Sequence, residues 1–245
     1  TSPDAPRGRG LTLTPCETKQ WALEHNIPVL SPEKLDESAR EKILSYRCEY
    51  ALVVAYGKIL PRKMLDAFPK GALNVHYSLL PKYRGASPVE GALLNDEKVT
   101  GVTIQKMVFE LDAGDVLASR EVPILPTDTT RELRPKLIAE GAELLVSVLP
   151  AFGEGEIIPI PQDPSAVTHV GKIEKTEGEL TLGVDDAENW RKYRDFAESP
   201  GTYFFLQRDS KKMRVKIKTA QFEQGVFTPL RVVPEGKKET DFSAL

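Results

Sequence analysis

The segment "NVHYSLLPKYRG", residues 74–85, places an amide and an imidazole one residue apart at the end of a short apolar run. In an extended strand Asn74 and His76 point to the same side, so they offer a hydrogen-bond donor and a titrating group together. Asp112, in the turn-forming segment "ELDAGD", adds a carboxylate further along the chain. These three groups suit chemistry at a carbonyl carbon, where charge develops on oxygen and a proton must move.

The elements that carry these residues are expected to form an α/β domain. Residues 51–57, "ALVVAYG", are a continuous apolar run ended by glycine, which predicts a buried parallel strand. Strand and helix patterns alternate around it, and this alternation predicts an open, mostly parallel sheet. The expected helices are residues 19–25, 31–45, 61–68, 87–94 and 129–149, and the expected strands are 27–30, 51–57, 71–76, 100–107 and 114–124.

The predicted sheet gives a reason for the three polar residues to meet. Ligands of open α/β sheets bind beyond the carboxyl ends of the strands, where Asn74 and His76 lie. A right-handed crossover through the helix at 87–94 would bring the strand end before Asp112 to the same edge. Each residue alone also has an ordinary explanation, as a turn former, a buried hydrogen-bonded imidazole and a turn aspartate, so the three are judged as a set.

The C-terminal part of the chain has a different pattern. Residues 1–152 form the α/β domain, which we expect to be N-terminally incomplete, and prolines mark 153–200 as a linker and connecting segment. Residues 201–245 alternate in strand-length pieces and predict a short β-barrel. Nine Lys and Arg against five Asp and Glu give this tail a charge of +4, which leaves −7 for the rest of the chain, whose total is −3.

The composition excludes several classes of protein. A chain of 245 residues with 40% hydrophobic and 28% charged residues is typical of a globular protein with a large and a small domain. Its two cysteines, Cys16 and Cys48, lack the spacing of a zinc site or a disulfide framework. No apolar run reaches membrane-spanning length, so we expect no membrane partner and a cytoplasmic or organellar-matrix location.

Residues 74–104, "NVHYSLLPKYRGASPVEGALLNDEKVTGVTI", followed by "ELDAGDVL", resemble the formyltransferase family that uses 10-formyltetrahydrofolate. The motifs that carry the resemblance are Asn-x-His, then Ser-Leu-Leu-Pro, then Leu-Asp-x-Gly in that order. The match is close over residues 51–122 and collinear outside them. The resemblance implies a Rossmann-like catalytic domain, an OB-like C-terminal barrel, a folate cosubstrate as formyl donor and no metal.

The same resemblance assigns roles to individual residues. Catalysis falls to Asn74, His76 and Asp112. The folate would be held by two loops, with the following residues: Tyr56, Gly57, Ile59 and Leu60, and Ser78, Leu79, Leu80 and Pro81. Apolar side chains in these loops suit the walls of a slot for a flat pterin.

The family has three branches that this chain could belong to: enzymes that act on initiator methionyl-tRNA, enzymes that act on amino-sugar nucleotides, and the folate hydrolase or dehydrogenase modules. The opening "SPDAPRGRG" and the ending "VVPEGKK" resemble the tRNA branch. A basic tail also suits a phosphate backbone, although a solvated charged face would explain the tail alone. We therefore expect a monomeric enzyme that binds tRNA through Arg7, Arg9, Lys216 and Lys218.

Two further alternatives accompany this reading. "PKYRG" resembles the sugar branch, so an amino-sugar nucleotide is the alternative acceptor. The family begins with a strand and a glycine-containing loop that the sequence from Thr1 lacks, so we expect a sheet without a strand–helix–strand unit of about 30 residues. A non-catalytic RNA-binding remnant is therefore the alternative from another class of protein.

Overall fold

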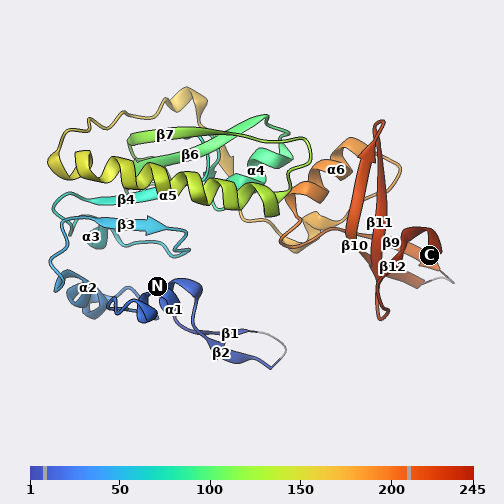
Figure 1. Ribbon diagram of the computed structural model, residues 1–245, viewed down its shortest axis with the longest axis horizontal. Helices are drawn as coiled ribbons and strands as arrows, with labels where there is room; N and C mark the ends of the chain where they lie inside the picture. The colour runs from blue at the N-terminus through green and yellow to red at the C-terminus, as the bar shows by residue number, and fades with distance from the viewer. Residues whose placement is uncertain (8–9, 209–210) are drawn as a thin grey trace.

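The computed structural model describes residues 1–7, 10–208 and 211–245, which fold into a larger N-terminal part and a smaller C-terminal part (Figure 1). The larger part is built on a four-stranded sheet in the order β3-β4-β6-β7. Its strands are β3 (Ala51–Val54), β4 (Ala72–His76), β6 (Val99–Lys106) and β7 (Val116–Pro123). Each part has a hydrophobic core of its own.

The sheet is mixed, so the prediction of a mostly parallel sheet is wrong for the described strands. Only β3 and β4 are parallel, whereas β4 pairs with β6, and β6 with β7, antiparallel. The cause is the connection after β4. The short strand β5 (Arg84–Gly85) and the seven-residue helix α4 (Pro88–Leu94) stay at the end of β4 where His76 lies, so β6 starts there and runs back.

Helix α5 (Thr130–Glu154) covers one face of this sheet (Figure 1). Gly141 lets it approach closely, since a Cβ there would lie 3.1 Å from methyl groups of Val75 and Val102. The helix starts with a capping box formed by Thr129 and Glu132, and not with a cap by the neighbouring Asp128. Asp128 instead accepts hydrogen bonds from the Leu125 backbone and from Lys136.

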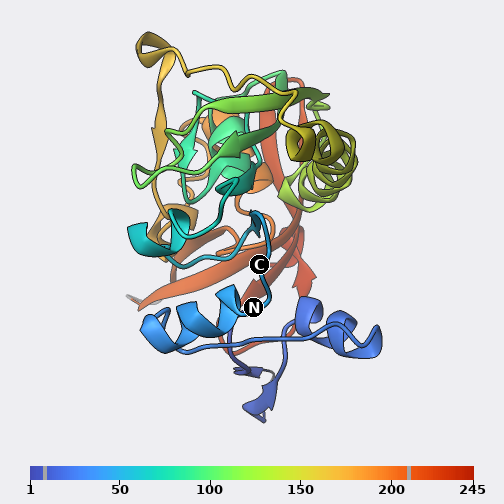
Figure 2. The ribbon, with the colours of Figure 1, turned by 90° about the vertical axis from the view of Figure 1, so that its left-hand side faces the viewer.

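The described residues before β3, and those up to residue 65 after it, lie along the β3 side of the sheet (Figure 2). They form a β-hairpin and the surrounding helices: β1 (Ala5–Arg7), β2 (Thr12–Thr14), α1 (Glu17–Glu24), α2 (Glu37–Leu44) and, after β3, α3 (Arg62–Leu65). No strand forms over residues 27–30. Strand β3 is an edge strand among the described residues, and Leu52 and Val54 are exposed on it rather than buried.

The connecting segment returns to the larger part before it reaches the C-terminal sheet. Strand β8 (His169–Val170) pairs with β5 in parallel, and Val116 and Ile160 exchange backbone hydrogen bonds. A short 3-10 turn at Pro164–Ala166 precedes β8, and a second one at Lys175–Gly178 and helix α6 (Asp186–Asp195) follow it. Helix α6 was not predicted, and its Trp190 and Tyr193 pack on the C-terminal core.

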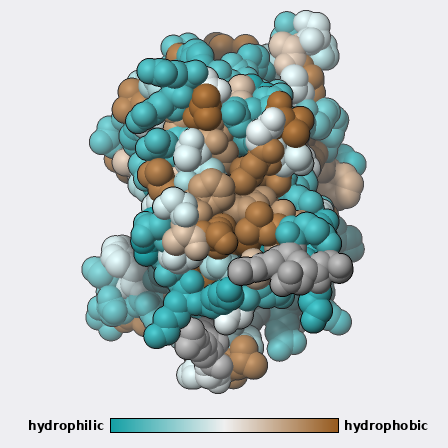
Figure 3. Space-filling view, turned by 90° about the vertical axis from the view of Figure 1, so that its right-hand side faces the viewer, coloured by the Kyte–Doolittle hydropathy of each residue, from teal (hydrophilic) through white to brown (hydrophobic). Residues whose placement is uncertain are grey.

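The C-terminal part is an open antiparallel sheet in the order β12-β11-β10-β9. Its strands are β9 (Tyr203–Arg208), β10 (Lys211–Glu223), β11 (Val226–Pro234) and β12 (Thr240–Asp241), followed by a 3-10 turn at Phe242–Ala244. The predicted β-rich tail is therefore confirmed, but the described strands do not close into a barrel. Apolar side chains gather in the middle of the outward face of this part (Figure 3).

Helix α6 also contacts the larger N-terminal part through a buried arginine, Arg194. Arg194 donates to the backbone oxygens of Asp128 and Leu125, at 2.7 and 3.3 Å, and lies 3.4 Å from the Asp96 carboxylate. A buried guanidinium needs such partners because its desolvation is costly. Within residues 1–7, 10–208 and 211–245, no helix is long and apolar enough to cross a membrane.

Candidate active site

The antiparallel pairing of β4 and β6 gathers four polar side chains on the sheet face opposite α5. Asn74 lies directly across from Gln105, and His76 lies across from Thr103. Side chains alternate along a strand, so Val75 points to the α5 side while Asn74 and His76 point away from it. Gln105 and Thr103 are fully buried and also face this way. The result is a polar face within an otherwise apolar sheet.

Asp112 reaches this face by a route that the sequence did not predict. Strand β6 runs antiparallel to β4, so its carboxyl end lies beside the amino end of β4, away from His76. The connection between β6 and β7 folds back over the sheet. Gly114 permits this close turn, because a Cβ there would lie 1.6 Å from the Lys106 carbonyl oxygen. The expected convergence is therefore found, but through a folded-back loop and not through a parallel crossover.

Two donors orient the Asp112 carboxylate. The backbone N–H of Gly85 donates to Oδ2 at 2.8 Å, and Gln105 Nε2 donates to Oδ1 at 2.9 Å. His76 Nδ1 lies 3.7 Å from the same Oδ1. Both side chains are largely buried, His76 with 6% and Asp112 with 11% of the side-chain surface exposed. Charge on the imidazole would therefore be felt strongly by the carboxylate.

The tautomer of His76 follows from its other contact. Nε2 lies 2.9 Å from the backbone oxygen of Tyr83. A carbonyl oxygen only accepts hydrogen bonds, so Nε2 carries a proton. In the neutral ring Nδ1 then presents a lone pair toward Asp112, whereas the imidazolium presents an N–H. Nδ1 is the ring atom left for chemistry.

The Ser-Leu-Leu-Pro segment is anchored to the same face. Ser78 is buried, and its hydroxyl donates to the backbone oxygen of Lys82 at 2.6 Å. Thr103 Oγ1 donates to the Ser78 backbone oxygen and accepts from the backbone N–H of Leu80. Leu79 packs over Gly101, where a Cβ would lie 2.4 Å from its side chain. The leucines and Pro81 thus border the polar face.

The other predicted folate loop, which contains Tyr56 and Leu60, follows β3. It lies beside the end of β4, because Val54 pairs with Val75 in parallel. Gly57 has a φ of +74°, which favours glycine at this turn. Burial raises the pKa of Tyr56, while Ile59 is 85% exposed and Leu60 is half-buried. The loop therefore projects an apolar side chain from the sheet edge where the polar face lies.

The predicted RNA-contacting residues are spread over two places. Arg7 lies in the β1–β2 hairpin and pairs with Glu17 at 2.6 Å, and Arg9 lies outside the described residues. Lys216 and Lys218 of β10 line a cavity of about 330 Å³ between α5, α6 and β10. Arg131 and Arg214 line it as well, together with Glu132 and Glu198. The structure does not bring the hairpin and this cavity together.

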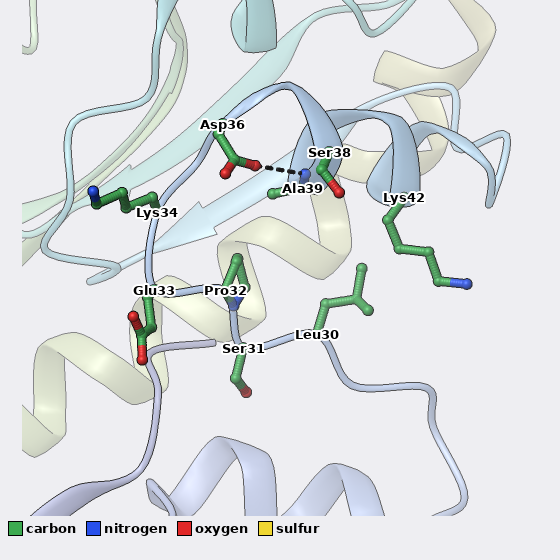
Figure 4. Close-up of a pocket in the computed structure, with 9 residues that line it drawn as sticks. All are labelled: Leu30, Ser31, Pro32, Glu33, Lys34, Asp36, Ser38, Ala39 and Lys42. Atoms are coloured by element: carbon green, nitrogen blue, oxygen red, sulfur yellow. Dashed lines mark hydrogen bonds between the residues drawn. The ribbon is translucent and has the colours of Figure 1, made fainter.

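A further cavity of about 590 Å³ lies between residues 30–34 and α2 (Figure 4). Its lining mixes Lys34 and Lys42 with Glu33 and Asp36, and Asp36 is occupied in capping α2 through the Ala39 N–H. This cavity contains none of Asn74, His76 and Asp112, so we place the candidate active site on the polar face instead. In the described part of the chain, no three His, Cys, Asp or Glu side chains are grouped as metal ligands would be.

Sequence reasoning missed several residues that shape the site: Tyr83, Arg84, Thr103, Gln105 and Gln162. The strand pattern offered a signal for two of them. In "TGVTIQKM", Thr103 and Gln105 are polar at alternate positions, whereas Val102 and Ile104 are apolar. This alternation predicts a strand with one polar and one apolar side. No local pattern distinguishes Gln162, which contacts Asp112 from 50 residues away.

A mixed Rossmann-like sheet with an amide, an imidazole and a carboxylate on one face defines a class of group-transfer enzymes, and comparison with known proteins identifies the family. Residues 1–149 match the formyl transferase family, and this chain belongs to it. The family assignment made from the sequence is confirmed.

Curated relatives narrow this to one branch of the family. "Methionyl-tRNA formyltransferase" of Dictyoglomus turgidum is 41% identical over 229 residues, which cover 93% of this chain and 72% of the relative. The protein of the same name from Dictyoglomus thermophilum is 37% identical over 272 residues, covering 99% and 86%. That from Bdellovibrio bacteriovorus is 41% identical over 227 residues, covering 92% and 71%.

Solved structures share the fold at 16–19% identity. Methionyl-tRNA formyltransferase from Clostridium thermocellum superposes with a TM-score of 0.64, over 91% of this chain and 92% of that one. HypX from Aquifex aeolicus in complex with tetrahydrofolic acid gives 0.68, over 91% of this chain, which spans 43% of HypX. The N-formyltransferase from Helicobacter canadensis with folinic acid and dTDP-3-aminofucose gives 0.63, over 83% and 71%. At these identities the likeness concerns the fold alone.

Proposed function

We propose that this protein transfers a formyl group from 10-formyltetrahydrofolate to the amino group of methionine on initiator methionyl-tRNA. The approach of His76 Nδ1 to Asp112 Oδ1, at 3.7 Å on a face that also carries Asn74, is the observation that carries the chemistry. The choice of acceptor is supported by relatives about 40% identical that are named for it. Because the acceptor is a tRNA, we place the reaction where translation occurs, in the cytoplasm or an organellar matrix. We also propose that the enzyme is a monomer.

In the proposed reaction the amine nitrogen of methionine attacks the formyl carbon. A C–N bond forms, the bond from that carbon to N10 of the folate breaks, and the proton lost by the amine ends on N10. The products are N-formylmethionyl-tRNA and tetrahydrofolate. Negative charge develops on the formyl oxygen during attack, so donors fixed in advance near that oxygen lower the barrier.

The polar face provides such donors. The Asn74 side chain is partly exposed on this face, so its N–H groups are accessible to the formyl oxygen. The imidazolium of His76 offers a second donor at Nδ1, because Tyr83 occupies Nε2. Asp112 lies 3.7 Å from that nitrogen and provides a route for the amine proton.

The residues around this face fit a folate donor. Ile59, which is 85% exposed, lies in the loop beside the end of β4. Its apolar side chain is therefore accessible to a flat ring. We propose that Tyr56, Gly57, Ile59 and Leu60 form one wall of the folate site and that Ser78, Leu79, Leu80 and Pro81 form the other. Ser78 acts through its backbone position, because its hydroxyl is already bonded to Lys82.

The tRNA would be held by basic residues of both parts. We propose that Lys216 and Lys218, with Arg131 and Arg214 beside them, contact phosphates at the cavity of about 330 Å³. Arg7 and Arg9 would contact the tRNA from the β1–β2 hairpin. In this proposal the C-terminal sheet works as an OB-like nucleic-acid-binding unit.

An assay of acceptor choice tests the proposal. Purified protein with 10-formyltetrahydrofolate is offered charged initiator tRNA or a dTDP-linked amino sugar, and formylated product is measured by mass spectrometry. We expect product on the tRNA and a kcat/KM for the sugar nucleotide at least about 100-fold lower. Efficient formylation of the sugar alone would establish the second acceptor class, and binding of tRNA without transfer to either acceptor would indicate a non-catalytic RNA-binding protein.

A further inference from the structure

The β6–β7 loop that carries Asp112 is held in place by a side chain from the connecting segment. Gln162 Nε2 donates to the backbone oxygens of Asp112 and Gly114, at 2.8 and 2.7 Å. An amide nitrogen has two hydrogens, and both are used here. Gln162 lies just after the backbone exchange between Val116 and Ile160, which brings the segment alongside β7.

The orientation of the Gln162 amide is fixed by its other end. Arg84 donates to Gln162 Oε1 from both Nε and Nη2, at 3.0 and 2.8 Å. A guanidinium only donates, so the amide oxygen must face Arg84 and the NH₂ group must face the two carbonyls. Arg84 is itself buried, and Glu110 lies 3.7 Å from its Nη1. Burying a guanidinium is costly without fixed partners, and the Gln162 oxygen supplies one.

We propose that Arg84 and Gln162 form a positioning pair that sets the Asp112 carboxylate beside His76. Asp112 has a φ of +49°, which is a left-handed backbone conformation. Residues other than glycine adopt this conformation at a cost in free energy. The β6–β7 loop also has to turn back toward His76, because β6 ends at the opposite end of β4. Gln162 holds the backbone of this turn, while Gly85, the neighbour of Arg84, holds the carboxylate through its N–H. Gln162, oriented by Arg84, and Gly85 therefore fix the backbone and the side chain of Asp112 together.

This inference rests on the proposed function for its kinetic readout, and it assigns a task to a segment that lies outside the α/β domain expected from the sequence. Gln162 and Arg84 touch neither substrate nor reacting atoms in this assignment. They act through Asp112, so their loss should lower kcat and leave the KM values for folate and tRNA almost unchanged.

Gln162→Glu is the sharpest test. The carboxylate keeps the size and the acceptor toward Arg84, and adds an ion pair, but it has no N–H for the Asp112 and Gly114 oxygens. We expect kcat to fall about 10- to 100-fold, KM values to stay within about twofold, and the melting temperature to fall because two carbonyl oxygens lose their donor. Arg84→Lys, which cannot donate twice to one oxygen in the same geometry, should lower kcat in the same direction. Ser165→Ala, which removes an exposed hydrogen bond to Asp163 on the same segment, is the matched control and should match wild type.

A measurement without turnover separates this inference from the proposed function. The Gly85 amide is protected from hydrogen exchange by its bond to Asp112 Oδ2. We expect its exchange, followed by NMR, to speed up at least about tenfold in Gln162→Glu and not in Ser165→Ala. Unchanged Gly85 exchange together with unchanged kcat in Gln162→Glu would overturn the positioning role. Faster Gly85 exchange in a protein that transfers no formyl group would uphold the pair and contradict only the proposed reaction.

Discussion

His76 presents Nδ1 to Asp112 Oδ1 at 3.7 Å while its opposite nitrogen, Nε2, is held 2.9 Å from the Tyr83 backbone oxygen. Nδ1 is therefore the ring nitrogen whose proton decides what His76 offers to Asp112. A neutral ring turns a lone pair toward a carboxylate, and an imidazolium turns a donor toward it. The separation of 3.7 Å is longer than a hydrogen bond, so the two atoms lie close without being bonded to each other.

The first prediction concerns His76. In His76→Ala the donor at Nδ1 is lost, and we expect kcat for formyl transfer to fall at least about 100-fold. The Tyr83 carbonyl also loses its partner, which should cost about 1–3 kcal/mol of stability. Steady-state kinetics and thermal melting check both effects. His169→Ala, at an exposed histidine, is the control, and a His76→Ala protein with near-wild-type kcat would contradict the catalytic role.

The second prediction concerns the charge of Asp112. Asp112→Asn keeps the size of the side chain but removes its charge, and it offers one acceptor oxygen in place of two to Gly85 and Gln105. We expect kcat to fall about 100-fold or more with folate binding retained, as measured by kinetics and by titration with tetrahydrofolate. Asp115→Asn in the same loop should behave like wild type. Equal losses in both variants would point to disruption of the loop rather than to a role for the carboxylate.

The third prediction concerns the basic cavity. Replacing Lys216 and Lys218 together by alanine should weaken tRNA binding and reduce the slope of log Kd against log salt concentration by up to about 2, because each phosphate contact contributes about 0.7–0.9. Binding measured from low to moderate salt checks this. Lys237→Ala with Lys238→Ala, on exposed residues of the same tail, is the control pair. An unchanged slope in the first double variant would remove these lysines from the tRNA site.

The fourth prediction concerns Asp195, whose two carboxylate oxygens are buried without a hydrogen-bond partner in the described structure. Burial, with Glu90 and Glu177 nearby, raises the pKa of Asp195 to about 9, and Arg134 opposes this shift. The folded protein thus keeps a proton that the unfolded chain loses above its ordinary value of about 3.9, so stability should decline as pH rises between about 4 and about 9.

Asp195→Asn removes this titration. We expect the variant to gain stability over wild type with rising pH, by up to about 1.4 kcal/mol per pH unit, as measured by urea unfolding at several pH values from 4 to 9. Asp163→Asn, at an exposed aspartate, should show no such trend. A constant difference across this range would mean that Asp195 is ionised in the folded protein.

Local sequence patterns predicted most elements of the larger part, because each has clear signals at its ends. The apolar run that ends at His76 became β4, and Ser87-Pro88 opens α4 as expected. The sheet direction was predicted wrongly, since it depends on where the chain goes after β4 and not on the strands themselves. Asp128 and Thr129 are both good N-cap residues, and Thr129 caps α5 because tertiary contacts with Leu125 and Lys136 occupy Asp128.

The site was predictable in part. Asn74, His76 and Asp112 could be named from their types and from the family resemblance, and their meeting on one face was expected. The pair that holds Asp112 could not be named, because Gln162 has no sequence signal and its partner Arg84 lies 78 residues away. Contacts of this kind depend on the return of the connecting segment to β5 and β7, which only the folded chain reveals.

The most direct test of the account follows both products of a single turnover. Excess enzyme is mixed with 10-formyltetrahydrofolate and charged initiator tRNA, and tetrahydrofolate, free formate and formylmethionine are measured over time. The account predicts one tetrahydrofolate for each formylmethionine, no free formate above background, and loss of both products in His76→Ala. Release of formate without formylmethionine, or formylmethionine formed at the wild-type rate by His76→Ala, would contradict it.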